Sequence, residues 1–299
     1  MNGVLPIFAV VVVGYLLGFR KTFSSQDAGS INKLVFMVAI PALSIDLIVN
    51  TPFAEFDWRV LFGFFLAELA TYLIGFLIAR KLLKCALPES ILLGLASSFG
   101  NHLLFVLPIT INLFGDIAAL PLVAIIAVDS VIIFGGTLMA MEAVGEGSFS
   151  WPQFTLKIVS NPPIMSLLIG LALVVLGTEL PASFLVFLKF AGSAASPCAL
   201  FALGIVLSQV TLGGRASVTL MICVAKLAVL PVIAGVILLG VLALDFETAK
   251  VPLMAAAAPC GAMAFVLALN YKVRTDAIAP AILFSTLISL VSLSLLAAH

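Results

Sequence analysis

The chain alternates between long apolar segments and short polar ones. Ten of the apolar segments approach or exceed the roughly 20 residues with which an α-helix crosses the hydrocarbon core of a bilayer. In chain order, these segments cover residues 3–19, 31–50, 59–83, 89–113, 118–141, 157–177, 183–209, 216–243, 249–270 and 277–298. The pattern predicts an all-α polytopic membrane protein, and the segments are numbered as spans 1 to 10.

The amino-acid composition agrees with an all-α membrane protein and indicates which kinds of binding partner to expect. Hydrophobic residues make up 63% of the chain and charged residues only 9%, whereas soluble domains carry about 25% charged residues. Lipid is therefore the expected main solvent, and a net charge of zero gives no sign of a nucleic-acid partner. The four cysteines are scattered without metal-ligand spacing, so no metal or other cofactor is expected.

The loops differ in their content of basic residues, and this difference predicts the orientation. One side of the membrane would carry Arg20, Lys21, Lys33, Arg80, Lys81, Lys84, Lys157, Arg215, Lys272 and Arg274. The other side would carry Arg59 and Lys250, with Lys189 nearby. The basic side is cytoplasmic by the positive-inside rule, so both termini are expected outside the cytoplasm. Because no basic region precedes the first apolar run, span 1 is expected to be retained rather than cleaved as a signal peptide.

The ten spans divide into two sets of five, residues 1–141 and 157–299, joined by a cytoplasmic linker at 142–156. A repeat with an odd number of spans must enter the membrane the opposite way up the second time, which predicts an inverted repeat. "PAL" at 41–43 in span 2 matches "PCAL" at 197–200 in span 7, and Pro121 opens span 5 as Pro280 opens span 10.

Two spans carry helix-breaking residues at their centres. Span 4 contains "SSFGNHLLFVLP", with Asn101, His102 and Pro108, and span 9 contains "AAAAPCGAMAF", with Pro259 and Gly261. We expect span 4 to be interrupted between Gly100 and Pro108 and span 9 around Pro259–Gly261, with the two crossing near the midplane of the bilayer. Lipid cannot satisfy the backbone groups that such breaks expose, so a polar cavity is expected there.

The cavity would suit an anion, because helix N-termini carry partial positive charge. Two simple proline kinks, with the Asn101 amide hydrogen-bonded to backbone, are the alternative interpretation. His102 could equally be a ligand, a proton carrier or an interior histidine with protein partners.

Three ionisable residues lie inside apolar runs, namely Glu68 in span 3, Asp129 in span 5 and Lys226 in span 8. A charge at the centre of a bilayer costs about 2.5–3.5 kcal/mol on insertion scales, so each is expected to face protein or water. Glu68 and Lys226 occupy equivalent positions of the two repeats. Two roles remain open for the three residues: a structural ion pair, or a site that couples transport to H+ or Na+.

The motifs of spans 2, 4, 6, 7 and 9 resemble those of the auxin efflux carrier family. The resemblance is carried by "NKLVFMVAIPALSI", "SSFGNHLLFVLPITINLFGDIAALPLV", "NPPIMSLLIGLAL", "AASPCALFALGIVLS" and "APCGAMAFVLALNYKVRTDAIAPAILFSTLISL". It implies ten helices in two inverted repeats, with spans 1, 2, 6 and 7 as a scaffold and spans 3–5 and 8–10 as a moving transport domain. It also implies an organic anion as substrate: auxin in plant members, and dicarboxylates such as malate or malonate in bacterial ones.

Carried over position by position, the resemblance places Asn101, Pro108 and Pro259 at the substrate site, with His102, Cys260 and Gly261 beside them. This chain departs from the family where Val106 replaces a frequent glycine and where His102 replaces a small residue. It also lacks the long cytoplasmic loop of many plant members, which fits a bacterial protein in the plasma membrane.

Secondary transport by elevator-like alternating access is therefore the expected function. No Walker sequence GxxxxGK[ST] is present, so the chain is not expected to use ATP directly. An anion or solute channel is the alternative, although no repeated ring of charges indicates a selectivity filter. An enzyme is not expected, because His102 is the only histidine within a span and no nucleophile motif accompanies it.

The resemblance further implies a homodimer through the scaffold, with span 2 or span 7 at the contact. Cross-linking or native mass spectrometry of the protein in detergent is expected to detect the dimer. Preparations that contain only monomers would contradict this expectation.

Overall fold

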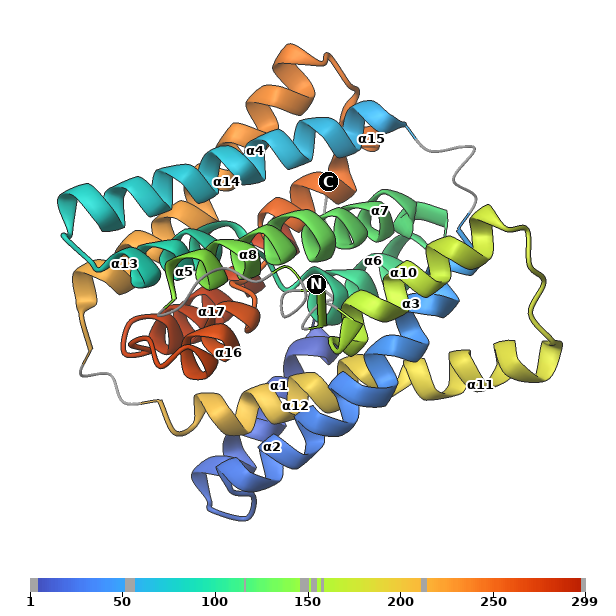
Figure 1. Ribbon diagram of the computed structural model, residues 1–299, viewed down its shortest axis with the longest axis horizontal. Coiled ribbons are helices and arrows are strands. Elements are labelled where there is room, and N and C mark those ends of the chain that lie inside the picture. Colours follow the sequence, from blue (N-terminus) through green and yellow to red (C-terminus); the bar gives the residue numbers. More distant parts are fainter. Residues whose placement is uncertain are drawn as a thin grey trace. The chain divides into compact units, whose positions relative to one another are not determined.

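The computed structural model describes residues 5–51, 57–115, 117–145, 151, 155–156, 159–210 and 214–296. Within these residues the regular structure is helical (Figure 1). The exception is one isolated bridge between two short extended segments. Most of the predicted linker 142–156, residues 157–158 of span 6 and the two ends of the chain lie outside the described residues.

Six continuous helices are long and apolar enough to cross a membrane. They cover Ser25–Val49, Trp58–Leu82, Leu120–Val144, Ala182–Leu207, Ala216–Val241 and Ile278–Leu296. Shorter apolar helices cover Leu5–Phe19, His102–Phe114 and Pro162–Val175. The prediction of a polytopic, all-helical membrane protein is confirmed.

The first half of the described chain contains these elements: α1 (Leu5–Phe19), α2 (Ser25–Leu34), η1 (Val35–Ala39), α3 (Ile40–Val49), α4 (Trp58–Leu77), η3 (Ile78–Leu82), α5 (Leu87–Ser98), η4 (His102–Val106), α6 (Leu107–Phe114), η5 (Ile117–Ala119), α7 (Leu120–Val128), η6 (Asp129–Phe134) and α8 (Gly135–Val144). The second half contains α10 (Pro162–Val175), α11 (Ala182–Ser193), α12 (Ala195–Leu207), α13 (Ala216–Val224), η7 (Ala225–Val229), α14 (Leu230–Gly235), η8 (Val236–Val241), α15 (Phe246–Ala256), α16 (Met263–Asn270) and α17 (Ile278–Leu296). Apart from the 3₁₀ turn η5, the η elements are π-helical turns.

Polar capping residues set several helix starts. Asp245 accepts a hydrogen bond from the Thr248 N–H at the start of α15, at 2.9 Å. At α2, Ser24 and Asp27 form a reciprocal capping box. The helix of span 2 therefore begins at Ser25, six residues before the predicted position 31, because the prediction followed hydropathy and gave no weight to this polar cap.

Three π-helical turns stand directly before prolines inside helices. Pro41, Pro108 and Pro231 each lie two residues after the end of such a turn, η1, η4 and η7 respectively. A proline has no N–H and its ring clashes with the carbonyl one turn back. Widening the preceding turn accommodates the ring and lets neighbouring groups take up the freed hydrogen-bonding capacity.

The predicted role of Pro108 as the residue that breaks span 4 is therefore wrong. The helix runs without interruption from His102 to Phe114, and the Leu107 N–H pairs with the His102 carbonyl across the π turn. The interruption lies earlier, at Phe99–Asn101, where the backbone leaves the helical conformation and Phe99 becomes extended.

The chain divides into two compact units. One contains residues 6–56 and 149–209, and the other contains residues 57–148 and 210–299 together with the first five residues. Each unit therefore combines segments from both halves of the sequence.

The first unit packs its helices closely through small residues. A Cβ placed on Gly14 of α1 would collide with the backbone of Phe201 in α12. In the same way, a Cβ on Gly192 would lie 2.9 Å from the Cα of Leu43. Close approach through small residues is a common way for helices to associate within a membrane. In this unit, α3 contacts α10 and α11, and α2 contacts α12.

The second unit surrounds two interrupted helices. α4 packs against α5, α7, α14 and α15, while α5 also contacts α8, α13 and α16. The first interruption separates α5 from η4, and the second separates α15 from α16, as the sequence predicts for residues around Pro259–Gly261.

The same turn occurs at two distant places of this unit. After η3, the Leu83 N–H pairs with the Ile78 carbonyl at 3.0 Å, and Lys84 adopts a φ of 54°. After η8, the Leu242 N–H pairs with the Ile237 carbonyl at 2.8 Å, and Ala243 adopts a φ of 49°. Each turn leads into a helix that is interrupted further on.

The two interruptions meet as a short antiparallel pair of extended segments. The Asn101 N–H donates to the Pro259 carbonyl at 3.0 Å, and the Gly261 N–H donates to the Phe99 carbonyl at 2.9 Å. Gly100 and Cys260 form the bridge between these two bonds. We call Phe99–Asn101 together with Pro259–Gly261 the crossing.

Glycine is required where the two backbones approach. A Cβ on Gly261 would lie 2.8 Å from Cδ1 of Phe99 and 3.1 Å from the Gly100 carbonyl oxygen. A Cβ on Gly100 would meet the imidazole ring of His102. A larger residue at either glycine would therefore have to displace the side chain of His102 or of Phe99.

We predict that Gly261→Ala destabilises the protein by about 1–3 kcal/mol, the usual cost of overpacking a filled site. The matched control is Gly136→Ala in α8, where a Cβ would meet nothing within 4 Å. Thermal melting of both purified variants tests this prediction. Equal melting temperatures for the two variants would contradict it.

Candidate functional site

Two buried side chains, those of His102 and Lys226, contact carbonyl groups at the C-terminal end of α15. The last carbonyls of a helix have no partner within the helix and form the negative end of its dipole. Here Nε2 of His102 lies 3.1 Å from the Ala255 carbonyl oxygen, and Nζ of Lys226 donates to the Ala256 carbonyl at 2.8 Å. The interruption of α15 thus creates the acceptors that position both side chains.

His102 also contacts a carboxyl group. Its Nδ1 lies 2.6 Å from Oδ2 of Asp129, and both side chains are only 2% exposed. A carbonyl oxygen can only accept, so the hydrogen on Nε2 points to Ala255. The contact between Nδ1 and Oδ2 therefore holds one shared proton, because two bare acceptor atoms would repel each other at this distance.

Glu68 and Lys226 complete a cluster of four ionisable residues that is closed to solvent. Both are 0% exposed, and the charged neighbours of Glu68 are Asp129, His102 and Lys226. The carboxyl group of Glu68 lies beside that of Asp129, although within the described part of the chain neither of its oxygens forms a hydrogen bond of good geometry. We call Glu68, His102, Asp129 and Lys226 the buried cluster; they come from α4, η4, η6 and η7.

Asn101 lies at the crossing and stands at the start of η4. It is partly exposed, and its side-chain amide makes no hydrogen bond with the described residues. η4 begins directly after Asn101, and α16 begins two residues after Gly261, so two helix N-termini stand next to the crossing. Backbone N–H groups of a first helical turn lack partners within the helix and suit an anion.

The structure gathers most of the predicted site residues into two neighbouring groups. Asn101, Pro259, Cys260 and Gly261 form part of the crossing, where the Cys260 N–H donates to Oγ of Ser285 at 3.0 Å. The four members of the buried cluster lie beside it. Pro108 is separate from both groups, since it occupies the second position of α6.

The sequence matches a known family over nearly its whole length. A model of the family described as "Membrane transport protein" matches residues 1–297. The chain belongs to this family of membrane transporters. The resemblance to the auxin efflux carriers and the expectation that the protein is not an enzyme are thereby confirmed.

Two relatives of the transporter match it from end to end. A protein of Rhizobium meliloti (strain 1021), named "Putative malonate transporter", is 27% identical over 300 residues, which are 97% of this chain and 92% of that protein. An "Uncharacterized transporter" of Methanothermobacter thermautotrophicus is 27% identical over 303 residues, covering 98% of this chain and 95% of that protein.

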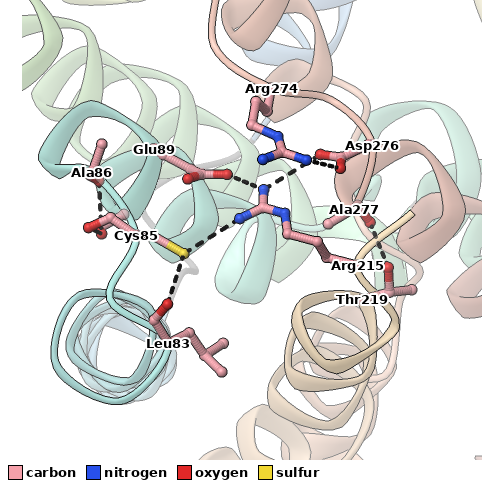
Figure 2. Close-up of polar contacts among 10 residues, drawn as sticks. Leu83, Cys85, Ala86, Glu89, Arg215, Thr219, Arg274, Asp276 and Ala277 are labelled. Atoms are coloured by element: carbon pink, nitrogen blue, oxygen red, sulfur yellow. Dashed lines mark hydrogen bonds and ion pairs between the residues drawn. The ribbon is translucent and has the colours of Figure 1, made fainter.

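A second charged group, which the sequence did not predict, ties together three segments of the transporter's second unit. Figure 2 shows the guanidinium of Arg215, just before α13, between Glu89 of α5 and Asp276, just before α17. Asp276 also accepts from Arg274 at 2.6 Å, and the Cys85 sulfur lies 3.6 Å from Nη1 of Arg215. In the sequence, Arg215 was only one of ten cations that set the orientation, because its partners lie 126 and 61 residues away.

The ion pairs around Arg215 change the pKa of Asp276. Burial tends to raise the pKa of Asp276, but the hydrogen bonds from Arg274 and Arg215 outweigh it and hold the pKa below its ordinary value. A carboxyl whose pKa is depressed by folding stabilises the folded state above its unfolded pKa, and this stability is lost as the pH falls through the folded pKa. The Asp276 pairs should therefore weaken in acid.

We predict that Arg215→Gln destabilises the transporter by about 1–3 kcal/mol, since it leaves Glu89 with an unsatisfied charge. The variant should also lose less stability than the unmodified protein when the pH is lowered. Thermal melting at neutral and acidic pH measures both effects. Arg274→Gln is the control, because that side chain is 64% exposed and surface pairs contribute only about 0–1 kcal/mol. At neutral pH, a larger loss of stability in the control than in Arg215→Gln would refute the prediction.

Proposed function

We propose that the transporter is a secondary carrier that moves a small organic anion, a carboxylate or dicarboxylate, across the bacterial plasma membrane. The observation that carries this proposal is the crossing of two interrupted helices, where the Asn101 amide stands beside two helix N-termini. The end-to-end similarity to a protein named "Putative malonate transporter" supports a dicarboxylate as the substrate.

The chemistry of the crossing suits a carrier. An amide offers two donors and an acceptor without carrying a charge, and helix N-termini add partial positive charge. Lys226, which could otherwise hold an anion, donates to the Ala256 carbonyl at the opposite, C-terminal end of a helix. An anion would therefore be bound with moderate strength, and a carrier needs such binding because it must release its substrate on the far side.

Ten spans in two inverted repeats are the arrangement that we propose for this carrier. The two similar turns at Lys84 and Ala243 support it, since each precedes a helix that is interrupted further on. The orientation of the basic loops supports termini on the non-cytoplasmic side. Homodimer formation through the scaffold belongs to the same proposal.

The proposed moving part is the unit that contains spans 3–5 and 8–10, and the proposed scaffold contains spans 1, 2, 6 and 7. The two compact units support this division, because residues 57–148 and 210–299 form one unit and residues 6–56 and 149–209 the other. Alternating access would then be elevator-like, with the crossing carried inside the moving unit.

Within the site, we assign substrate binding to the crossing, with Asn101 as its main polar group and Pro259, Cys260 and Gly261 as its walls. Pro108 and His102 would support the segment that holds Asn101. Glu68, Asp129 and Lys226 would tune access and coupling rather than bind the anion, because they are closed to solvent.

We predict that Asn101→Ala weakens malonate binding by about 1–3 kcal/mol, the worth of one hydrogen bond to a charged group. This corresponds to a rise in Kd of about 5- to 150-fold. Isothermal titration of the detergent-solubilised protein with malonate measures the change. Asn270→Ala is the matched control, because this asparagine is exposed at the opposite end of α16.

Glu68→Gln is expected to keep malonate binding and to alter the rate or the pH dependence of transport. The reverse result would be normal binding by Asn101→Ala and no binding by Glu68→Gln. It would move the substrate site from the crossing to spans 3 and 8.

A further inference from the structure

We propose that the His102–Asp129 pair is the proton site of this carrier and that its one shared proton moves together with the organic anion. This inference rests on the proposed function and extends it. It assigns His102 to the proton rather than to the anion. It also names the co-substrate, a proton, and the two atoms that hold it, Nδ1 of His102 and Oδ2 of Asp129.

The geometry leaves room for one proton only between Nδ1 of His102 and Oδ2 of Asp129. Nε2 of His102 is committed to the Ala255 carbonyl at 3.1 Å, so its hydrogen stays in place. Nδ1 and Oδ2 lie 2.6 Å apart, a separation that fits one N–H···O or O–H···N hydrogen bond. The occupied pair is neutral, either as imidazolium with carboxylate or as imidazole with carboxylic acid.

Removing this proton changes both charge and structure. The pair then carries one negative charge, and the lone pair of Nδ1 faces a carboxylate oxygen without a hydrogen between them. The hydrogen bond that joins η4 to η6 is lost. Whatever the charges of Glu68 and Lys226, the buried cluster becomes one unit more negative.

This change reaches the proposed anion site through the chain itself. Asn101 directly precedes His102 and stands at the start of η4, so the tie between η4 and η6 holds the segment that presents the Asn101 amide. An anion at the crossing would be repelled by the additional negative charge of the empty pair. Proton and anion therefore favour each other's binding, and by linkage the effect is reciprocal.

The surroundings of the pair contain the groups that could exchange a proton with it. Glu68 approaches from α4, Lys226 from η7, and the thiol of Cys260 lies in the crossing. The carboxyl group of Glu68 lies beside that of Asp129, so it can accept the proton on its way. The rings of Phe64 and Phe99 flank the imidazole and help to exclude water.

The first arm of the test observes the proton without transport. The chain has two histidines, His102 and His299, so His299→Gln leaves one set of ring signals in a protein labelled with 15N-histidine. We expect Nε2 to stay protonated at every pH, while the Nδ1 signal moves as the pair loses its proton. With Asp129→Asn added, Nδ1 should remain an unprotonated acceptor. A bare Nε2, or an Nδ1 signal that does not respond to pH, would overturn the proposal.

The second arm measures radiolabelled malonate in proteoliposomes that contain the full chain. With one pH unit of inward proton gradient and the membrane potential held at zero by K+ and valinomycin, one proton per malonate permits about tenfold accumulation, because each tenfold ratio matches one pH unit. The unmodified protein should accumulate malonate towards this limit. Asp129→Asn should lose the accumulation, while its malonate exchange continues and no longer depends on pH.

Two further variants show whether a change in malonate accumulation comes from the loss of the proton site. Asp245→Asn removes a carboxyl at the N-cap of α15, where asparagine caps equally well, and should behave as the unmodified protein. His102→Gln keeps a donor that can reach the Ala255 carbonyl and should resemble Asp129→Asn. If Asp129→Asn does not fold, His102→Gln still tests whether the pair is the proton site.

The outcomes separate this inference from the function on which it rests. Malonate exchange by the unmodified protein without accumulation under the gradient would overturn the proton site and leave the carrier function standing. Accumulation by Asp129→Asn at the unmodified level would overturn it as well. If the unmodified protein neither binds nor exchanges malonate or another dicarboxylate, the proposed function fails, and the ring signals of His102 still decide whether the pair holds the proton.

Discussion

The backbone at the crossing must find hydrogen-bond partners inside two apolar spans, where lipid offers none. Two interrupted helices solve this by pairing with each other: Asn101 donates to Pro259, and Gly261 donates to Phe99. The pairing is short, but it joins the ends of four helices, α5, η4, α15 and α16. The close approach of the two backbones accounts for glycine at position 261, and the imidazole of His102 fills the space beside Gly100.

The buried cluster follows from this constraint. Because α15 stops at Ala256, its last carbonyls need donors, and its negative end attracts cations. His102 and Lys226 supply these donors, and Asp129 lies against the free nitrogen of His102. The two donor side chains therefore gather at a C-terminal helix end, while the N-terminal ends of η4 and α16 keep their partial positive charge for the proposed anion.

The local amino-acid sequence determined where most helices of this protein lie and where the second interruption occurs. Hydropathy is a property of consecutive residues, so each apolar segment predicted a helix or, in spans 4 and 9, a pair of helices near the bounds observed. Pro259 and Gly261 predicted the second interruption because their effect on the backbone is intrinsic to them. The first interruption includes Gly100 as predicted but does not extend to Pro108, since a proline in a membrane helix can follow a π turn without breaking the helix.

Only the tertiary structure decided which polar groups meet. The partners of His102 lie 27 and 153 residues away, and those of Arg215 lie 61 and 126 residues away, so no local pattern connects them. The sequence identified Glu68, Asp129 and Lys226 as costly charges that must face protein or water, because the cost of burial depends on the residue and its apolar neighbours. Which carbonyl or carboxyl offsets that cost depends on the packing of α4, η4, η6, η7 and α15, and that packing exists only in the folded chain.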